Sequence, residues 1–477
     1  MREERAVLKK ALSSMDVLAT GLGALIGWGW IVAFGSMIQK AGVLGLILGF
    51  AIGGTLMLTI GLTCGELSSS MPVTAGGFAF TLKALGVKHA YWCGCFMAIS
   101  YIALLMFEAV SIPVIFATLW PRVFEVMPLY TVAGFKVYLP QVILGILVSF
   151  LWYGINYVGA KLYGIVQTVM IVIFIVLGFC TVGISLYKGN PAFFIENMWG
   201  NLSPIKGIVS VLALAGFFYI GFDMIPQAAE EYKAEPKKLA RLIQGSIIVG
   251  TIWYVLIGCM IAFQIPKSEL PNLSLPAASA VARTWGQAGF YIVLFLGIIG
   301  IVTTYSASFY SASRVLFGLA RGKLFPKGFA KLHPKYGTPT FPITIAAMAS
   351  IIAVFLGRAA VMWFLDATSA FVVLFYLYIA CSYITLRKQE PEMNRPYRAP
   401  GGILTGIVAV CASIFFFLSL ILPFSPGALI WPYEYAIFII FLIIATIIYV
   451  LMAPTLKETP VEEYEWLVLG IESDKER

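Results

Sequence analysis

Two apolar stretches of the chain are interrupted by residues that could bind a small charged molecule. The first interruption is residues 21–30 (GLGALIGWGW), which carry four glycines in nine positions within an apolar segment of residues 15–38. Each glycine weakens a helix by roughly 1 kcal/mol relative to alanine, so this stretch favours a break. Unwound backbone at membrane depth must face protein or a water-filled cavity, where its free amide groups can bind a carboxylate. We therefore predict that this break forms half of a binding site.

The second interruption is residues 214–226 (LAGFFYIGFDMIP), which place glycines, a carboxylate and a proline in one apolar stretch. Pro226 removes a backbone donor and favours a kink or break. Asp223 is costly inside a membrane unless it is paired or hydrated, which makes it a functional candidate. It could hold a proton or attract a cation; alternatively, it caps the backbone that Pro226 frees. Phe217 and Phe222 flank the break and are candidate gates over a ligand.

The composition predicts the class of protein in which these breaks must lie. The chain has 477 residues, of which 60% are hydrophobic and only 12% charged, and its mean hydropathy is +0.92. Its apolar runs are continuous and do not alternate, which excludes a transmembrane β-barrel and predicts an all-α polytopic membrane protein. The net charge of +9 lies in short loops between apolar runs, which is typical of membrane topology signals and argues against a nucleic-acid partner.

We predict twelve membrane spans in one bundle. They are residues 15–38, 42–69, 91–120, 139–157, 162–187, 207–230, 240–264, 287–319, 341–357, 361–386, 403–422 and 434–452. With the N-terminus in the cytoplasm, most of the 32 Lys and Arg residues fall in inside segments, so both chain ends are expected in the cytoplasm of a cell membrane. The tail of residues 453–477 is acidic and is expected to be mostly solvated.

The two interruptions occupy equivalent places in two halves of the chain. An offset of 194 residues pairs Ile26-Gly27-Trp28 with Ile220-Gly221-Phe222, so a glycine-interrupted span opens each of two five-span blocks. An odd number of spans per block inverts the second block in the membrane. Corresponding broken spans in two halves indicate an inverted-repeat transporter site.

Five segments, in order along the chain, resemble the motifs of the amino acid–polyamine–organocation (APC) family of transporters. They are Gly23–Gly29, Gly65–Gly77, Phe217–Asp223 with Ala229–Glu231, Ser313–Arg314 with His333–Pro339, and Arg395–Gly402. The resemblance implies a LeuT-like fold, in which a five-plus-five inverted repeat with broken helices 1 and 6 is followed by two further helices. The expected parts are a cytoplasmic N-terminus (1–14), a first repeat (15–187), an inverted second repeat (205–387), two added helices (403–452) and a cytoplasmic tail (453–477).

For an α-amino acid, the two breaks offer complementary backbone groups. Amides of the first break would bind the carboxylate, and carbonyls from Phe218 to Gly221 would bind the ammonium group. The alternative is that these glycines only permit close helix packing. The predicted substrate-binding residues are Ala24, Ile26, Gly27, Trp28, Gly29, Phe217, Phe218, Gly221, Phe222 and Asp223. Trp28 departs from the family, which commonly has a small residue there, and its ring could shrink the pocket or pack against a neighbouring helix.

A proton or a sodium ion is the expected coupling ion, and no other cofactor or metal is expected. Glu108 and Asp223 are candidate proton carriers, and Thr303, Thr304 and Ser306 lie where sodium-coupled members of the fold place hydroxyl ligands. The alternative for the three hydroxyls is a bond to carbonyls of their own helix. Some proton-coupled relatives carry a lysine in the fifth span, about where Phe174 stands here.

The sequence therefore predicts a secondary transporter of amino acids that works by alternating access, coupled to ions or by exchange. The alternatives are a permease for an amine, polyamine or ethanolamine, and a nutrient sensor that binds the same ligand without moving it. No phosphate loop or pair of nucleophile and base appears, so an enzyme is not expected. The expected partners are an amino acid and the lipid bilayer; the oligomeric state is left open.

Overall fold

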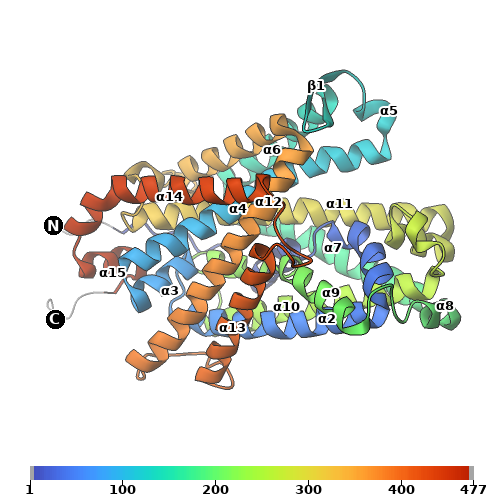
Figure 1. Ribbon diagram of the computed structural model, residues 1–477. Coiled ribbons are helices and arrows are strands. Elements are labelled where there is room, and N and C mark those ends of the chain that lie inside the picture. Colours follow the sequence, from blue (N-terminus) through green and yellow to red (C-terminus); the bar gives the residue numbers. More distant parts are fainter. Residues whose placement is uncertain (1–4, 472–477) are drawn as a thin grey trace.

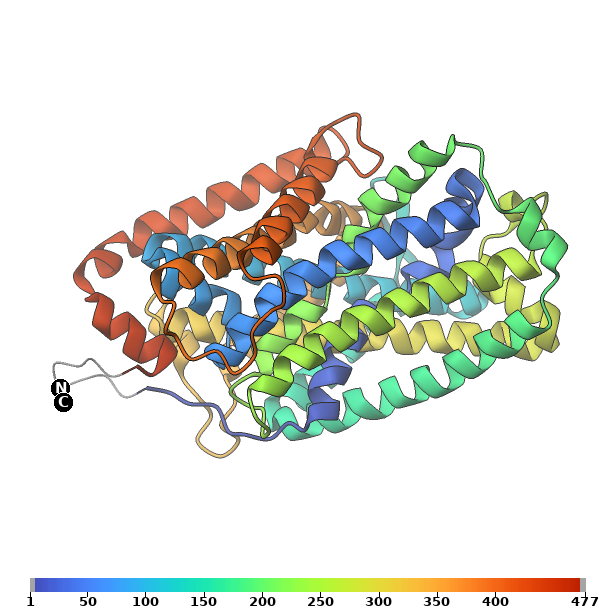
Figure 2. The same cartoon turned by 90° about the horizontal axis from the view of Figure 1, so that it is seen from below.

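The computed structural model describes residues 5–471, and side chains are described throughout this range except at residues 358–361. Long helices form one elongated bundle (Figures 1 and 2). The helices are α1 (Ser14–Leu25), α2 (Gly29–Ser70), α3 (Gly76–Leu85), α4 (Val87–Leu119), α5 (Pro121–Phe124), α6 (Leu139–Val158), α7 (Ala160–Tyr187), α8 (Pro191–Glu196), α9 (Pro204–Phe218), α10 (Lys237–Gln264), α11 (Pro276–Arg321), α12 (Thr340–Gln389), α13 (Ile403–Ile421), α14 (Tyr433–Glu458) and α15 (Val461–Leu469). The 3₁₀ helices are η1 (Phe222–Ala228), η2 (Leu270–Asn272) and η3 (Lys327–Ala330), and the strands are β1 (Pro128–Val132) and β2 (Phe135–Tyr138).

Within the described range, eleven helices are long and apolar enough to cross a membrane. This confirms a mostly helical polytopic protein, whereas the count of twelve stays a prediction. The difference lies at the start of the chain, because α1 has only 12 residues and the rest of the expected first span continues into the second within α2. Gly42 leaves helical geometry inside α2 with φ of 78°, which a glycine adopts without strain and which turns the chain between the two segments.

Both predicted breaks are present, and they touch one another. Helix α1 ends at Leu25 and α2 begins at Gly29; α9 ends at Phe218 and a turn leads into η1. Gly221 in that turn has φ of 136°, and a Cβ atom there would lie 2.6 Å from the backbone nitrogen of Leu25. No residue other than glycine fits this contact, which holds the two breaks together.

The two ends of the bundle differ. We call the end that carries residues 5–13 and α15 the terminal end, and the opposite end, which carries β1 and β2, the hairpin end (Figure 1). The antiparallel hairpin pairs Val132 with Phe135, and both intervening residues have positive φ, as a tight two-residue turn requires. The expectation of an all-α chain was therefore wrong for this short segment of the loop between α5 and α6.

The tail is mostly exposed or half-buried up to residue 471, but part of it packs on the bundle. Helix α15 folds back on the bundle and buries Tyr464, Leu467 and Val468, because its apolar face packs against α3 and α11. Residues 1–4 and 472–477, which belong to the predicted N-terminus and tail, lie outside the described residues.

Candidate functional site

A cavity of about 440 Å³ lies at the two helix breaks, and we call it the main cavity. Its volume falls in the range of small-molecule sites. Backbone and side chains of the first break, α4, the second break, α10, α11 and α12 form its walls. The predicted residues that line it are Ala24, Gly27, Trp28, Gly29, Phe217, Phe218, Glu108 and Thr304.

The breaks leave backbone groups unpaired at this cavity. In the part of the chain that the structure describes, the amides of Gly27 and Trp28 have no hydrogen-bond acceptor, and the carbonyl of Ile220 has no donor. Unpaired amides at the start of a helix attract an anionic group, and unpaired carbonyls attract a cationic one. One wall can therefore bind a carboxylate and the other an ammonium group.

Tyr254 of α10 joins the two breaks, and sequence reasoning missed it. Its hydroxyl donates to the carbonyl of Leu25 at 2.6 Å and lies 3.0 Å from the carbonyl of Phe218, the last residues of α1 and α9. These are carbonyls that a helix end leaves without an intrahelical partner. Nothing in the sequence marks this tyrosine among the other aromatic residues of the apolar spans.

Thr303 and Thr304 fix the end of α1 in a similar way. Their hydroxyls lie 3.2 Å and 2.9 Å from the carbonyl of Gly23, and each also lies within hydrogen-bond distance of carbonyls of α11 itself. This geometry fits the alternative that they bond helix carbonyls, and their role as sodium ligands stays a prediction. Ser306 is buried without a hydrogen-bond partner among the described residues and does not line the main cavity.

The Trp28 ring both lines the main cavity and packs against a neighbouring helix. A Cβ atom on Gly297 of α11 would lie 2.3 Å from a ring carbon of Trp28, so the small glycine makes room for the large ring. Phe174 packs edge-on to Trp30 with ring centroids 6.3 Å apart. The polar residue of α7 that reaches this region is instead Gln167, whose side-chain amide donates to the carbonyls of Ala19 and Thr303.

Four predicted binding residues do not line the main cavity, namely Ile26, Gly221, Phe222 and Asp223. Phe222 is buried and stacks on Tyr376 with ring centroids 5.2 Å apart, and its role as a gate stays a prediction. Asp223 accepts hydrogen bonds from the hydroxyls of Tyr101 and Tyr376, each at 2.6 Å, and from the amide of Gly221 at 2.9 Å. Asp223 thus caps the second break, which matches the structural alternative more closely than contact with a ligand.

Asp366 of α12 was also missed. Its side chain lines the main cavity and a second, smaller cavity, in which Glu434 of α14 also takes part. An acidic residue within the tenth predicted span was the available signal, by the same reasoning that selected Asp223.

Ion pairs close the bundle at the terminal end. Arg314 donates to both carboxylate oxygens of Glu231 at 3.0 and 3.1 Å, and Tyr310 adds a hydrogen bond. Glu230 binds Arg321 at 2.6 Å and Arg5 at 3.1 Å. Burial would raise the pKa of the Glu230 carboxyl, but Arg321 and Arg5 together hold this pKa below its ordinary value.

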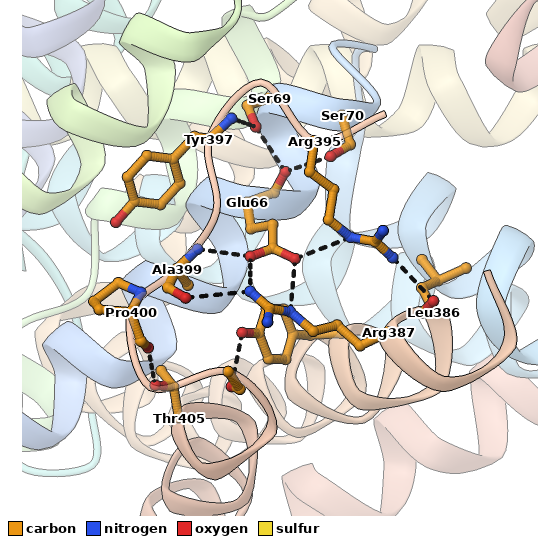
Figure 3. Close-up of polar contacts among 12 residues, drawn as sticks. Glu66, Ser69, Ser70, Leu386, Arg387, Arg395, Tyr397, Ala399, Pro400 and Thr405 are labelled. Carbon is orange, nitrogen blue, oxygen red and sulfur yellow. Dashed lines mark hydrogen bonds and ion pairs between the residues drawn. The ribbon is translucent and has the colours of Figure 1, made fainter. Parts of the chain in front are cut away.

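A third buried glutamate explains two of the sequence motifs (Figure 3). Glu66 of α2 binds Arg387 at 2.9 and 2.5 Å and Arg395 at 3.1 Å, and it accepts the amide of Ala399 at 2.7 Å. Ser69, one turn later, accepts the amide of Tyr397 at 3.2 Å. The segments Gly65–Gly77 and Arg395–Gly402 therefore meet in space and tie α2 to the loop before α13.

Comparisons with known proteins identify the family of the chain. A family model described as amino acid permease matches residues 12–449. The chain is 27% identical over 438 residues to the branched-chain amino acid permease BcaP of Bacillus subtilis, a match covering 87% of this chain and 88% of the relative. It is 26% identical over 465 residues to the methylthioribose transporter of the same organism, covering 93% of each chain. It is 25% identical over 420 residues to the serine/threonine exchanger SteT of that organism, covering 87% of this chain and 92% of the relative.

Proposed function

The chain belongs to the amino acid permease family and is a secondary amino acid transporter, and we propose that it moves its substrate by alternating access around the main cavity. The observation that carries this proposal is the meeting of two broken helices, whose unpaired backbone groups face a cavity of about 440 Å³. Discontinuous helices at a central cavity are the usual binding elements of such transporters.

The substrate lies with its carboxylate at the amides of Gly27 and Trp28 and its ammonium group at the carbonyl of Ile220. Ala24 and Gly29 complete the wall on the side of the carboxylate, and Phe217 and Phe218 cover the opposite side. Glycine at position 27 leaves the backbone amides accessible to the substrate. An added Cβ atom there would lie 3.3 Å from the hydroxyl oxygen of Thr304, which also lines the main cavity.

The membrane arrangement follows from the same proposal. The two segments α1 and the first part of α2 form one crossing, which brings the total to twelve, with residues 15–187 and 205–387 as inverted repeats. Both termini lie on the cytoplasmic side of the cell membrane, so the hairpin end faces the outside of the cell. Met37 and Thr118, near that end, line the main cavity, while the ion pairs of Glu230 and Glu231 close the terminal end. The structure then corresponds to an outward-facing state.

One observation favours a second candidate, a permease for an amine that lacks a carboxylate. Two acidic side chains, Glu108 and Asp366, line the main cavity, and no described lysine, arginine or histidine does. Such a lining suits a cation. In that case the amides of the first break contribute little to affinity.

Counterflow in proteoliposomes tests the proposal. Purified protein is reconstituted, loaded with one unlabelled amino acid at a time, and presented with the same labelled compound outside. We expect exchange with at least one amino acid, and loss of this exchange in Gly27→Leu. The matched control is Gly183→Leu on the exposed face of α7, where an added Cβ atom meets nothing within 4 Å. Binding without any exchange would favour a sensor, and full exchange by Gly27→Leu would contradict the proposed site.

A further inference from the structure

Two carboxyl groups from distant parts of the chain, one partly and one fully buried, meet beside the main cavity. Asp366 of α12 and Glu434 of α14 both line a second cavity of about 260 Å³. The two cavities share walls formed by Leu214, Phe217, Phe218 and Ile220 together with Asp366. Asp366 is therefore the acidic side chain that faces both spaces.

Glu434 is almost completely buried, with 1% of its surface exposed. Its Oε2 atom accepts the amide of Ile430 at 2.6 Å, while no N–H or hydroxyl group of the described residues donates to its Oε1 atom. The carboxyl groups of Asp366 and Glu434 line the same small cavity, close enough for a hydrogen bond between them. A hydrogen bond between two carboxyl groups requires a proton on one of them, and this proton has to come from solution.

The surroundings supply no cation to replace that proton. No lysine, arginine or histidine of the described residues lines either cavity. The other titratable groups that face the pair are Glu108 and Tyr254, both across the main cavity; the second cavity adds none. Two carboxylates so close, with no described cation beside them, repel each other, so the pair takes up and releases protons as a unit.

The packing of α12 and α14 keeps the pair together. Trp363 stacks on Tyr433, with ring centroids 4.5 Å apart and nearly parallel planes. These rings precede Asp366 by three residues and Glu434 by one, so they fix the distance between the two helices beside the carboxyl groups. A movement of α12 relative to α14 would separate the carboxyl groups and change how they hold the proton.

We propose that Asp366 and Glu434 form a shared-proton site that binds one proton in each transport cycle. The proposal rests on the proposed transport function and adds its coupling ion. In the state closed at the terminal end, a proton enters from water of the main cavity and forms an O–H bond with one of the two carboxyl groups. When the cycle separates the pair, this bond breaks and the proton returns to water; no other bond changes.

Accumulation driven by a pH difference tests the site. Proteoliposomes holding wild type, Asp366→Asn, Glu434→Gln or the double variant receive an inward-directed gradient of one pH unit at zero membrane potential. One coupled proton supports up to about tenfold accumulation under this gradient. For each protein, accumulation under the pH gradient is divided by its counterflow activity. In each variant we expect this ratio to fall to the value that the same variant shows without a pH gradient. The double variant should lose no more than either single variant. Glu392→Gln, which changes an exposed glutamate of the loop after α12, should keep the wild-type ratio.

The outcomes separate this inference from the proposed function. A wild type that exchanges amino acids but ignores the pH gradient overturns the proton site and leaves transport standing. A response of both single variants equal to that of the wild type overturns it as well. A wild type that exchanges no amino acid defeats the proposed function.

Infrared spectroscopy measures the protonation of the carboxyl pair without a transport experiment. The wild type should show the C=O band of a protonated carboxyl group at neutral pH, and each single variant should lose part of this band. An identical band in the wild type and the double variant would contradict the shared proton.

Discussion

Two sets of carboxyl groups in this protein have opposite surroundings. At the terminal end, Glu66, Glu230 and Glu231 each face at least one arginine. Beside the cavities, the described surroundings of Glu108, Asp366 and Glu434 contain no ion-pair partner. Burying a charge is expensive unless it is paired, so the first set consists of fixed charges that hold segments together. The second set has to be neutralised by something that comes and goes, namely a proton or a cationic ligand.

The largest expected loss of stability comes from removing the cation of the most buried ion pair in the first set, Arg314 and Glu231. Arg314→Ala leaves Glu231 without its cation, and we expect the free energy of unfolding to fall by about 3–5 kcal/mol. Thermal unfolding in detergent at neutral pH measures the loss. Arg314→Lys restores a positive charge without the paired contacts and should recover part of it. An unchanged unfolding temperature in Arg314→Ala would show that the ion pairs do not stabilise this end.

A smaller loss of stability is expected when one cation of Glu66 is removed, because other groups still donate hydrogen bonds to this carboxylate. In Arg387→Ala, the carboxylate keeps Arg395 and the amide of Ala399, so the cost should be about 2 kcal/mol, that of hydrogen bonds to a charged group. The same unfolding measurement applies. Arg387→Ala combined with Arg395→Ala should cost more than the sum of the two single variants, since only then does Glu66 lose both cations. A purely additive result would mean that the two arginines act separately.

The contact that joins the two breaks should show a still smaller energetic effect with a functional consequence. Tyr254→Phe removes the hydroxyl shared by the carbonyls of Leu25 and Phe218, at a cost of about 1 kcal/mol. We expect weaker substrate binding, measured on purified protein. Tyr435→Phe is the matched control, because its hydroxyl donates to the carbonyl of Ile421 away from the main cavity. Equal affinities in the two variants would remove Tyr254 from the site.

The smallest loss of stability is expected for Glu108, a member of the second set. Glu108 has no ion-pair partner among the described residues, and its Oε2 atom is buried without a hydrogen bond. Glu108→Gln removes no ion pair, so we expect a much smaller loss in the free energy of unfolding than in Arg314→Ala. A loss as large as that of Arg314→Ala would place Glu108 in the same set as Glu231.

Both helix breaks could be predicted from the sequence, because glycine and proline act through local backbone geometry. The positions of Gly27 and Gly221 at the breaks follow from the same local effect. The motif that contains Glu66 was visible too, but its partner segment lies more than 300 residues away, and only the fold brings them together.

Contacts between distant segments set the limit of such prediction. Asp223 was predicted among the binding residues, and the sequence did not reveal the hydroxyls of Tyr101 and Tyr376 that bond to its oxygens. Asp366 and Glu434 gave no combined signal because 68 residues separate them in the sequence. The tail was predicted to be mostly solvated because it is acidic, whereas α15 also has an apolar face that is buried against the bundle.

The most direct test of the central claim compares an amino acid with the amine formed by its decarboxylation. Both compounds compete for binding against the labelled amino acid that the wild type exchanges best. If the amides of Gly27 and Trp28 bind the carboxylate, the amine should compete at least about tenfold less well, a difference of about 1.4 kcal/mol. Equal competition by the two compounds would contradict the capture of a carboxylate at the first break.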